Sequence, residues 1–168
     1  MPLALTVALG SDMVPPGLVA LALVCAALPD VDAVGLWLGI PYDHPFGHRG
    51  FTHSLPFAAA LAGVGCLFAP ELGVVPWVAF VVLLVSAASH GLLDAMTNGG
   101  LGVALVSPFS HRRYFLPWRV IEVSPLTLPG LLSRRGLRVL ASELRYVWVP
   151  CLAVALAGVA LRGALGGL

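Results

Sequence analysis

Long apolar runs constrain the fold of this chain more than any other feature of its sequence. Residues 74–93 form the longest run, and others cover residues 13–28, 54–69 and 146–161. Hydrophobic residues make up 59% of the 168-residue chain and charged residues only 10%, with a mean hydropathy of +0.96. Ordinary soluble domains are less apolar than this, and runs approaching ~20 residues suit bilayer-spanning helices. The sequence therefore predicts an all-α, polytopic integral membrane bundle with about four membrane-embedded helices.

Two further segments are predicted to lie between these helices. Residues 94–130 contain Gly99-Gly100 and several prolines, a pattern typical of a long, irregular Pro-rich loop that caps a site. Residues 131–145 interleave arginines with leucines, which predicts an amphipathic helix lying at the membrane interface. No repeat and no second soluble region interrupts the sequence, so residues 1–168 are expected to form a single membrane-embedded domain.

The charged residues indicate which side of the membrane the polar end of the chain faces. All nine cations are arginines, and eight of them lie between Arg49 and Arg145. The positive-inside rule therefore predicts that this end of a multi-pass protein faces the cytoplasm across the inner (plasma) membrane. A formal net charge of only +1 argues against nucleic acid as a partner, because a nucleic-acid surface needs many cations on one face. The lipid bilayer is the expected partner.

Histidines and aspartates gather where the apolar runs end. The three groups are Pro29-Asp30-Val31-Asp32, His48-Arg49-Gly50-Phe51-Thr52-His53-Ser54 and His90-Gly91-Leu92-Leu93-Asp94. If the first helix ends at Pro29 and the helices flanking residues 70–75 form a hairpin, all three groups reach the same end of the bundle. Ionisable residues at the rim of membrane helices are costly and are functional candidates by default. The sequence thus predicts a metal centre, with the following candidate ligands: Asp30, Asp32, His48, His53, His90 and Asp94.

The types and spacing of these side chains define the chemistry that they could support. His90 and Asp94 are four residues apart, so on a helix they share a face and can reach one ion. Mixed imidazole and carboxylate ligands suit Zn²⁺ best here, with Mn²⁺ or Fe²⁺ as alternatives, and Ca²⁺ less well. The candidates suffice for one or two divalent ions. Arg49, and also Arg112 or Arg113, could neutralise a phosphate, for which a guanidinium fork is well shaped.

Simpler roles for the same residues stay open. Asp30 and Asp32 could cap a helix or pair with Arg49. His90 could be a helix-end histidine whose ring is satisfied by a backbone carbonyl. Three isolated residues in expected loops are predicted to be exposed and outside the site: Asp43, His44 and His111.

Taken together, these motifs resemble those of a known family. The order and spacing of the three groups resemble those of the motifs in the YdjM-like membrane-bound metal-dependent hydrolases. The resemblance includes Ala95-Met96-Thr97 after the third group and Pro108-Phe109-Ser110 beyond it. The similarity covers roughly residues 20–125. That family is distantly similar to the zinc phospholipase C and single-strand nuclease superfamily, whose members hydrolyse phosphoesters with clustered metals.

The resemblance carries implications for the site. It implies a bacterial or archaeal inner-membrane protein in which the six candidate residues are metal ligands and Arg49 supports them. One departure from the family pattern affects this expectation. Members of the family usually carry a His near the start of the first helix, whereas here Thr6 is followed by Val7 and the first His is His44.

These expectations combine into one functional hypothesis and one alternative. The chain is expected to be a membrane-bound hydrolase that cleaves a phosphoester of a lipid or lipid-linked substrate with metal-activated water. Arg49 would stabilise charge on the phosphoryl oxygens, and Asp32 or Asp94 would act as general base. The alternative is a metal-binding membrane protein without hydrolytic activity, such as a transporter, a sensor or a structural protein. A closed ligand shell would favour a structural metal.

Overall fold

All regular structure in the described part of the chain is helical. The structure, a computed structural model, describes residues 2–10, 13–125 and 128–166. Within these ranges β-structure is limited to isolated bridges, between Thr97 and Ile121 and between Val103 and Tyr114. The stretches that are long and apolar enough to cross a membrane are Pro16–Trp37, Pro76–Ala95 and Arg134–Ala164. The all-α membrane class is thus confirmed, with three helices of spanning length among the described residues where about four embedded helices were expected.

The first of these stretches continues past the point where the sequence predicted its end. It consists of α2 (Pro16–Ala27), a 3-10 turn η1 (Leu28–Asp32) and α3 (Ala33–Trp37). The α-helix α2 ends at Ala27, and Pro29 is accommodated in the first turn of η1, where a missing N–H group leaves no bond unmade. The α-helix thus ends beside Pro29 as expected, but the helical stretch continues to Trp37, so Asp30 and Asp32 lie on a tight turn inside a longer segment.

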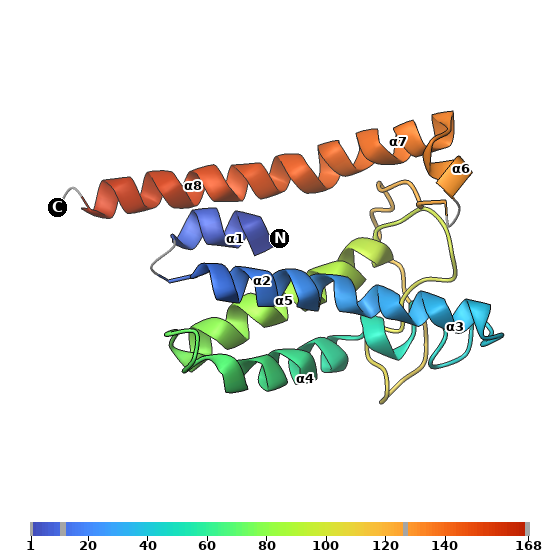
Figure 1. The fold of residues 1–168 in the computed structure, drawn as a ribbon. Helices are drawn as coiled ribbons and strands as arrows, with labels where there is room; N and C mark the ends of the chain where they lie inside the picture. The colour runs from blue at the N-terminus through green and yellow to red at the C-terminus, as the bar shows by residue number, and fades with distance from the viewer. Residues whose placement is uncertain (1, 11–12, 126–127, 167–168) are drawn as a thin grey trace.

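Two antiparallel helices form the other side of the bundle. α4 (Leu55–Gly65), extended by η3 (Cys66–Phe68), is followed by α5 (Pro76–Ala95), and α5 also packs against α2 (Figure 1). Ser54 caps α4, since its Oγ accepts a hydrogen bond from the N–H of Phe57 at 3.1 Å. The buried contact surface includes Leu18, Ala22, Ala58, Ala62, Val82 and Leu83. Small residues on α2 and α4 allow close approach, which favours helix packing in a membrane.

The C-terminal helix is one long element instead of two. α7 (Arg134–Glu143), a π turn η4 (Leu144–Trp148) and α8 (Val149–Gly166) follow a single line across the molecule (Figure 1). The π turn ends at Trp148, two residues before Pro150, which has no N–H group to donate to the preceding turn. The sequence predicted a separate amphipathic helix at the interface, whereas this segment continues into the apolar helix. Only 6% of its spanning window is buried, as expected for a helix that faces lipid.

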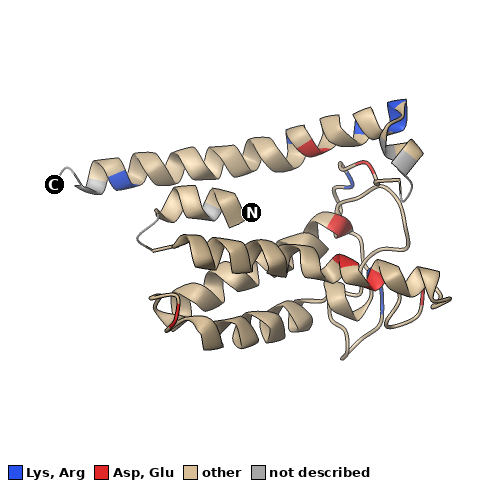
Figure 2. Ribbon diagram, viewed as in Figure 1, with Lys and Arg blue, Asp and Glu red and all other residues tan. Residues whose placement is uncertain are grey.

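A long loop and a short helix close one end of the bundle. The loop begins after α5 at Met96, as the Pro-rich segment predicted, and leads to the short helix α6 (Leu128–Leu131). Arg113 in this loop donates from Nη2 to the carbonyl oxygen of Tyr42 at 2.7 Å and from Nη1 to that of His48 at 3.0 Å. Most charged residues gather at this end, which we call the loop end (Figure 2). The helix α1 (Pro2–Leu9) packs against α8.

Candidate metal centre

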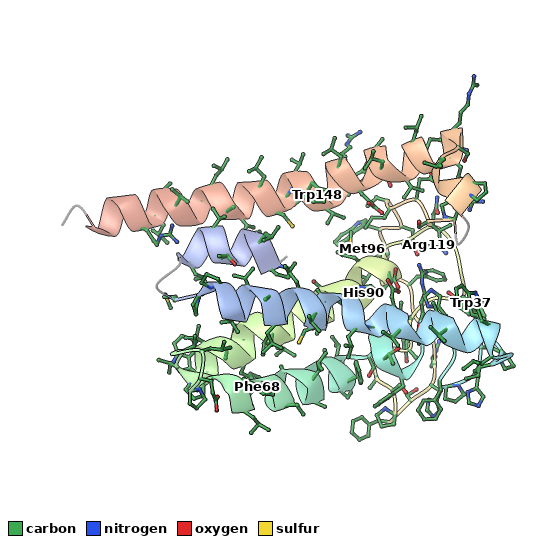
Figure 3. The ribbon with its side chains drawn as sticks, in the orientation of Figure 1. Trp37, Phe68, His90, Met96, Arg119 and Trp148 are labelled. Carbon is green, nitrogen blue, oxygen red and sulfur yellow. The ribbon has the colours of Figure 1, made fainter. Side chains whose placement is uncertain are left out.

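Side chains from three separate segments converge at the loop end. Asp30 comes from the turn η1, His53 from the 3-10 turn η2 (Phe51–His53), and His90 and Asp94 from the last turns of α5. One nitrogen or carboxylate oxygen of each residue lies within 4.8 Å of those of the others. His90 lies where α5 passes the segment formed by α2 and η1 (Figure 3). We call these four residues the donor cluster.

The spacing of donor atoms in the cluster suits a small divalent ion. His53 Nε2 lies 3.2 Å from Asp94 Oδ2 and 3.5 Å from Asp30 Oδ1. His90 Nε2 lies 3.3 Å from Asp30 Oδ1 and 3.9 Å from Asp94 Oδ2. Four bonds of about 2.0–2.1 Å to tetrahedral Zn²⁺ would place neighbouring donors about 3.4 Å apart. The side chains would therefore need to move little to bind such an ion.

A glycine beside His90 allows α5 to approach the His53 turn closely. A Cβ atom built on Gly91 would lie only 2.2 Å from the backbone oxygen of His53. Any larger residue would therefore push α5 away from η2, and would separate His90 and Asp94 from His53. This close approach explains why a glycine follows His90 in the motif that ends at Asp94.

Both imidazoles of the cluster present the same ring nitrogen to its centre. His53 Nδ1 lies 3.0 Å from Asp32 Oδ2, and His90 Nδ1 lies 2.8 Å from the carbonyl oxygen of Ala26. A carboxylate and a carbonyl can only accept, so in a neutral ring they hold the proton on Nδ1. The Nε2 lone pairs are then left for the side of the ring that faces Asp30 and Asp94. Metal-binding histidines are held by outer acceptors in this way.

His53 Nε2 is a buried nitrogen without a hydrogen bond. The His53 side chain is 0% exposed, and Nε2 makes no hydrogen bond. The oxygens of Asp94 and Asp30 are near enough to accept one, but neither lies in a suitable direction. Leaving such an atom unpaired costs about 1–3 kcal/mol. An ion between this nitrogen and the two carboxylates would remove the cost, so the residues fit a divalent metal in both chemistry and spacing.

The carboxylates around His53 shift its protonation. Burial by itself lowers the pKa of His53, but Asp30, Asp32 and Asp94 outweigh this effect and raise the pKa to about 10. At neutral pH these carboxylates thus favour a positive charge on the ring. A divalent cation in the donor cluster would supply positive charge at the same place, which is a second reason to expect that a cation binds there.

Asp32 and His48 lie behind His53, outside the donor cluster. Asp32 Oδ1 lies 2.7 Å from His48 Nδ1, and Asp32 Oδ2 accepts a hydrogen bond from Thr52. The Asp32 side chain is only 4% exposed. Asp32, His48 and His53 form a second group whose donor atoms lie within 4.8 Å of one another. In the structure Asp32 thus orients two histidines at once.

Arg49 holds Asp94 from the side opposite the donor cluster. Its Nη2 donates to Asp94 Oδ1 at 3.0 Å, and its Nη1 donates to Thr97 Oγ1 at 2.8 Å and to the carbonyl oxygen of Gly99 at 3.2 Å. The backbone of Arg49 has a φ of +62°, in the left-handed region that non-glycine residues rarely adopt. Such a conformation persists where the surroundings hold it, as these hydrogen bonds do. Arg49 therefore positions a carboxylate of the cluster.

A cavity of about 620 Å³ opens beside the donor cluster. Its walls include Asp30, Tyr42, His48, Arg49, Asp94 and Arg135. The Asp30 side chain is 57% exposed, in contrast to the fully buried His53. The donor cluster is therefore open toward the cavity and closed on the opposite side. Burial raises the pKa of Tyr42, so its hydroxyl group stays protonated and can donate a hydrogen bond into the cavity.

The remaining residues considered from the sequence lie outside the cluster. Asp43, His44 and His111 are exposed in loops, as expected. Arg112 lies over the ring of Tyr114, and Arg113 binds loop carbonyls. Neither arginine is among the residues around the cavity.

Sequence reasoning missed three contributors to the site. They are the carbonyl group of Ala26, the hydroxyl group of Thr52 as a donor to Asp32, and Thr97 as a partner of Arg49. Both threonines lie within the motifs quoted from the sequence, so their position was a usable signal. A backbone carbonyl carries no side-chain signal at all, and only the packing of α2 against α5 places Ala26 beside His90.

Comparison with known proteins identifies the family and confirms the resemblance. Residues 1–165 match the YdjM inner membrane protein family. The chain is 40% identical to inner membrane protein YbcI of Escherichia coli (strain K12) over 153 residues, which cover 89% of this chain and 87% of that protein. It is also 36% identical to inner membrane protein YdjM of the same organism and of Shigella flexneri. That match extends over 87 residues, which are 48% of this chain and 44% of those proteins. No solved structure matches. With helices of spanning length and a family match over almost all its residues, the chain is an inner membrane protein that belongs to the YdjM family.

Proposed function

We propose that this protein is a metal-dependent hydrolase that cleaves a phosphoester of a lipid or lipid-linked substrate at the membrane surface. The observation that carries the proposal is the orientation of the two imidazoles in the donor cluster. Each is held through Nδ1 by an acceptor, with Asp32 beside His53 and the carbonyl of Ala26 beside His90. Their Nε2 atoms converge with two carboxylates on one point. Two carboxylates also balance the charge of a divalent ion.

The openness of the cluster supports a catalytic role over a structural one. Structural Zn²⁺ sites are closed by protein ligands, whereas catalytic sites keep a position for water or substrate. Asp30, at the edge of the cluster, is 57% exposed and faces the 620 Å³ cavity. This side gives room for a substrate next to a bound ion. Three of the four donors lie at helix ends, His53 just before α4 and His90 and Asp94 in the last turns of α5, which argues against a transport pathway through the middle of the bilayer.

Different residues around the cavity would have different roles in hydrolysis. A bound divalent ion would polarise a phosphoryl oxygen and lower the pKa of water. Arg49 keeps Asp94 in place and puts a fixed positive charge at the cavity wall, where it can stabilise charge on the phosphoryl oxygens. Asp32 is buried and surrounded by three donors, so it is poorly placed to accept a proton from water. His48, which lines the cavity and is oriented by Asp32, is the better general base.

The proposed substrate follows from where the cavity lies. The loop end carries most of the arginines (Figure 2), so the positive-inside rule orients the cavity toward the cytoplasm. A cavity at the ends of spanning helices can receive a lipid headgroup without removing the lipid from the bilayer. A phosphoester in such a headgroup is the bond that a metal centre with a nearby guanidinium group is suited to cleave.

Hydrolysis by purified protein tests the proposal. The protein, loaded in turn with Zn²⁺, Mn²⁺ and Fe²⁺ in detergent, is assayed for phosphate release from phosphatidic acid and for cleavage of bis(p-nitrophenyl) phosphate. We expect one of these ions to support turnover, and His90→Ala to lower it by about a hundredfold or more, because a metal contributes several kcal/mol to such a reaction. His111→Ala is the matched control and should keep full activity. A protein that binds the ion stoichiometrically but cleaves neither class of phosphoester would support the non-catalytic metal protein instead.

A further inference from the structure

We propose that an apolar groove between α1, α2 and α8 binds an acyl chain of an anionic phospholipid whose phosphate group reaches the donor cluster. This inference rests on the proposed function and adds the place where the lipid tail lies. The groove has a volume of about 410 Å³. The residues that line it are Pro2, Leu3, Ala4, Val7, Leu23, Val147, Trp148, Cys151, Leu152 and Ala155. It is thus formed by apolar side chains of two helices of spanning length and of α1.

The groove adjoins a second pocket that leads to the metal centre. This pocket, of about 190 Å³, shares Val147 and Trp148 with the groove and shares Arg49 and Asp94 with the 620 Å³ cavity. The intermediate pocket therefore connects the apolar groove to the cavity beside the donor cluster, and the three form one continuous series. An amphiphile is the kind of ligand that matches a site with one apolar end and one ionic end.

The junction between groove and pocket lies at an irregular point of the C-terminal helix. Val147 and Trp148 belong to the π turn η4, and such turns occur frequently at functional sites. Trp148 lies over the part of the molecule that holds His90 and Met96 (Figure 3). Tryptophan joins a large apolar ring to an N–H donor, which suits the boundary between a lipid tail and its polar group.

The charges along the series favour a lipid with a single phosphate group. Arg49 and Arg135 line the cavity that holds the donor cluster, so a phosphate group there would meet two guanidinium groups. The intermediate pocket instead carries Glu122 and Glu143. Carboxylates only accept hydrogen bonds, so they suit hydroxyl or amide groups of a lipid backbone and repel a second phosphate. A helix of another protein could cover the groove, but it would not extend into this ionic pocket.

Photo-cross-linking in vesicles tests the inference. The full-length protein is reconstituted with a phosphatidic acid that carries a diazirine in the middle of one acyl chain, and labelled peptides are identified by mass spectrometry. We expect the label in peptides that contain Leu23 and Leu152. Leu152→Trp fills the groove and should lower this labelling about fivefold or more, since overpacking costs about 1–3 kcal/mol. Leu161→Trp is the matched control, because Leu161 lies on the same helix and is as exposed as Leu152, at 61% and 59%.

The outcomes separate this inference from the proposed function. Two results overturn the groove as a lipid site. The label is spread evenly along α8, or Leu152→Trp leaves the labelling unchanged, as Leu161→Trp does. Metal binding and hydrolysis could still hold in that case. Conversely, groove labelling that responds to Leu152→Trp in a protein without hydrolytic activity supports the lipid site and removes the hydrolase. Groove labelling should also persist in His90→Ala, since the tail contacts do not include the metal ligands.

Discussion

At the scale of single residues, the buried carboxylate of Asp32 contacts histidines of the candidate metal centre without belonging to the donor cluster. Its oxygens contact His48, His53 and Thr52, and its side chain is 4% exposed. It belongs to the group with His48 and His53, not to the donor cluster, whose Asp30 and Asp94 line the cavity. We therefore infer that Asp32 orients ligands, and that Asp94 binds the ion directly.

This division of roles predicts unequal effects of two substitutions. Asp32→Ala should weaken metal affinity about 10- to 100-fold, which is the usual effect of losing an outer partner of a histidine ligand. Asp94→Ala should abolish stoichiometric binding, because it removes a donor atom. Titration of metal-free protein with Zn²⁺ against a competing chelator measures both. Asp43→Ala, an exposed residue in a turn, is the control. Equal loss of affinity in Asp32→Ala and Asp94→Ala would mean that Asp32 is itself a ligand.

The candidate residues were predictable from the sequence, but their individual roles were not. Asp30, His53, His90 and Asp94 stand at the ends of apolar runs, and that position alone singled them out. The alternatives considered for His90 were a metal ligand or a ring satisfied by a backbone carbonyl. The structure shows the carbonyl contact, at Nδ1, and leaves Nε2 facing the donor cluster, so the two roles are compatible. A sequence cannot assign the two nitrogens of one ring, since packing decides which partner each one meets.

At the scale of elements, Gly91 sets the distance between α5 and η2. A methyl group at this position would lie 2.2 Å from the backbone oxygen of His53, so one of the two elements must move. Gly91→Ala should therefore weaken metal affinity roughly tenfold to a hundredfold, the equivalent of the 1–3 kcal/mol that overpacking costs. All donor atoms remain in this variant, so the loss would be purely geometric. The same chelator competition measures it.

A second glycine provides the control for this variant. Gly63 lies in α4, and a Cβ atom built there meets nothing within 4 Å. Gly63→Ala should leave metal affinity unchanged and should stabilise α4 slightly, because alanine favours a helix over glycine by about 1 kcal/mol. If Gly91→Ala binds metal as tightly as Gly63→Ala does, the close approach of α5 to His53 is not what holds the cluster together.

Helices were predicted well where the apolar runs had clear ends. The run at residues 74–93 corresponds to α5 (Pro76–Ala95), and the run at residues 54–69 corresponds to α4 with η3. Two expected boundaries need a correction, for physical reasons. α2 ends at Ala27, beside Pro29, but a proline is compatible with the first turn of η1, so the helical stretch continues to Trp37. The change from an arginine-rich to an apolar pattern near Arg145 marks a change of environment along one continuous helix, not a break in it.

At the scale of the whole molecule, the distribution of charge predicts the orientation in the membrane. The loop end carries most of the charged residues (Figure 2), whereas Arg162 lies on the far part of α8 and donates to the carbonyl of Ala8. The positive-inside rule predicts that the loop end faces the cytoplasm. The turn between α4 and α5, which contains Glu71, would then face the other side of the inner membrane.

Cysteine labelling measures this orientation. Asp43→Cys at the loop end and Glu71→Cys at the opposite end are matched, since both replace exposed acidic residues in turns. In a variant whose native cysteines are replaced, a membrane-impermeant maleimide applied to spheroplasts should label Glu71→Cys. It should label Asp43→Cys only after the membrane is broken. The reverse pattern would place the donor cluster on the outer side of the inner membrane and would contradict the proposed access to cytoplasmic substrates.

Metal content is the most direct test of the central claim, because the proposed hydrolysis depends on an ion in the donor cluster. The protein is purified in detergent, supplied with Zn²⁺, desalted and analysed by elemental mass spectrometry beside His90→Ala, Asp94→Ala and the control His111→Ala. We predict stoichiometric metal in the wild type and in His111→Ala, and almost none in the other two. Equal metal in all four proteins, or none in the wild type, would mean that these histidines and aspartates form a polar network that holds the helices together and binds no ion.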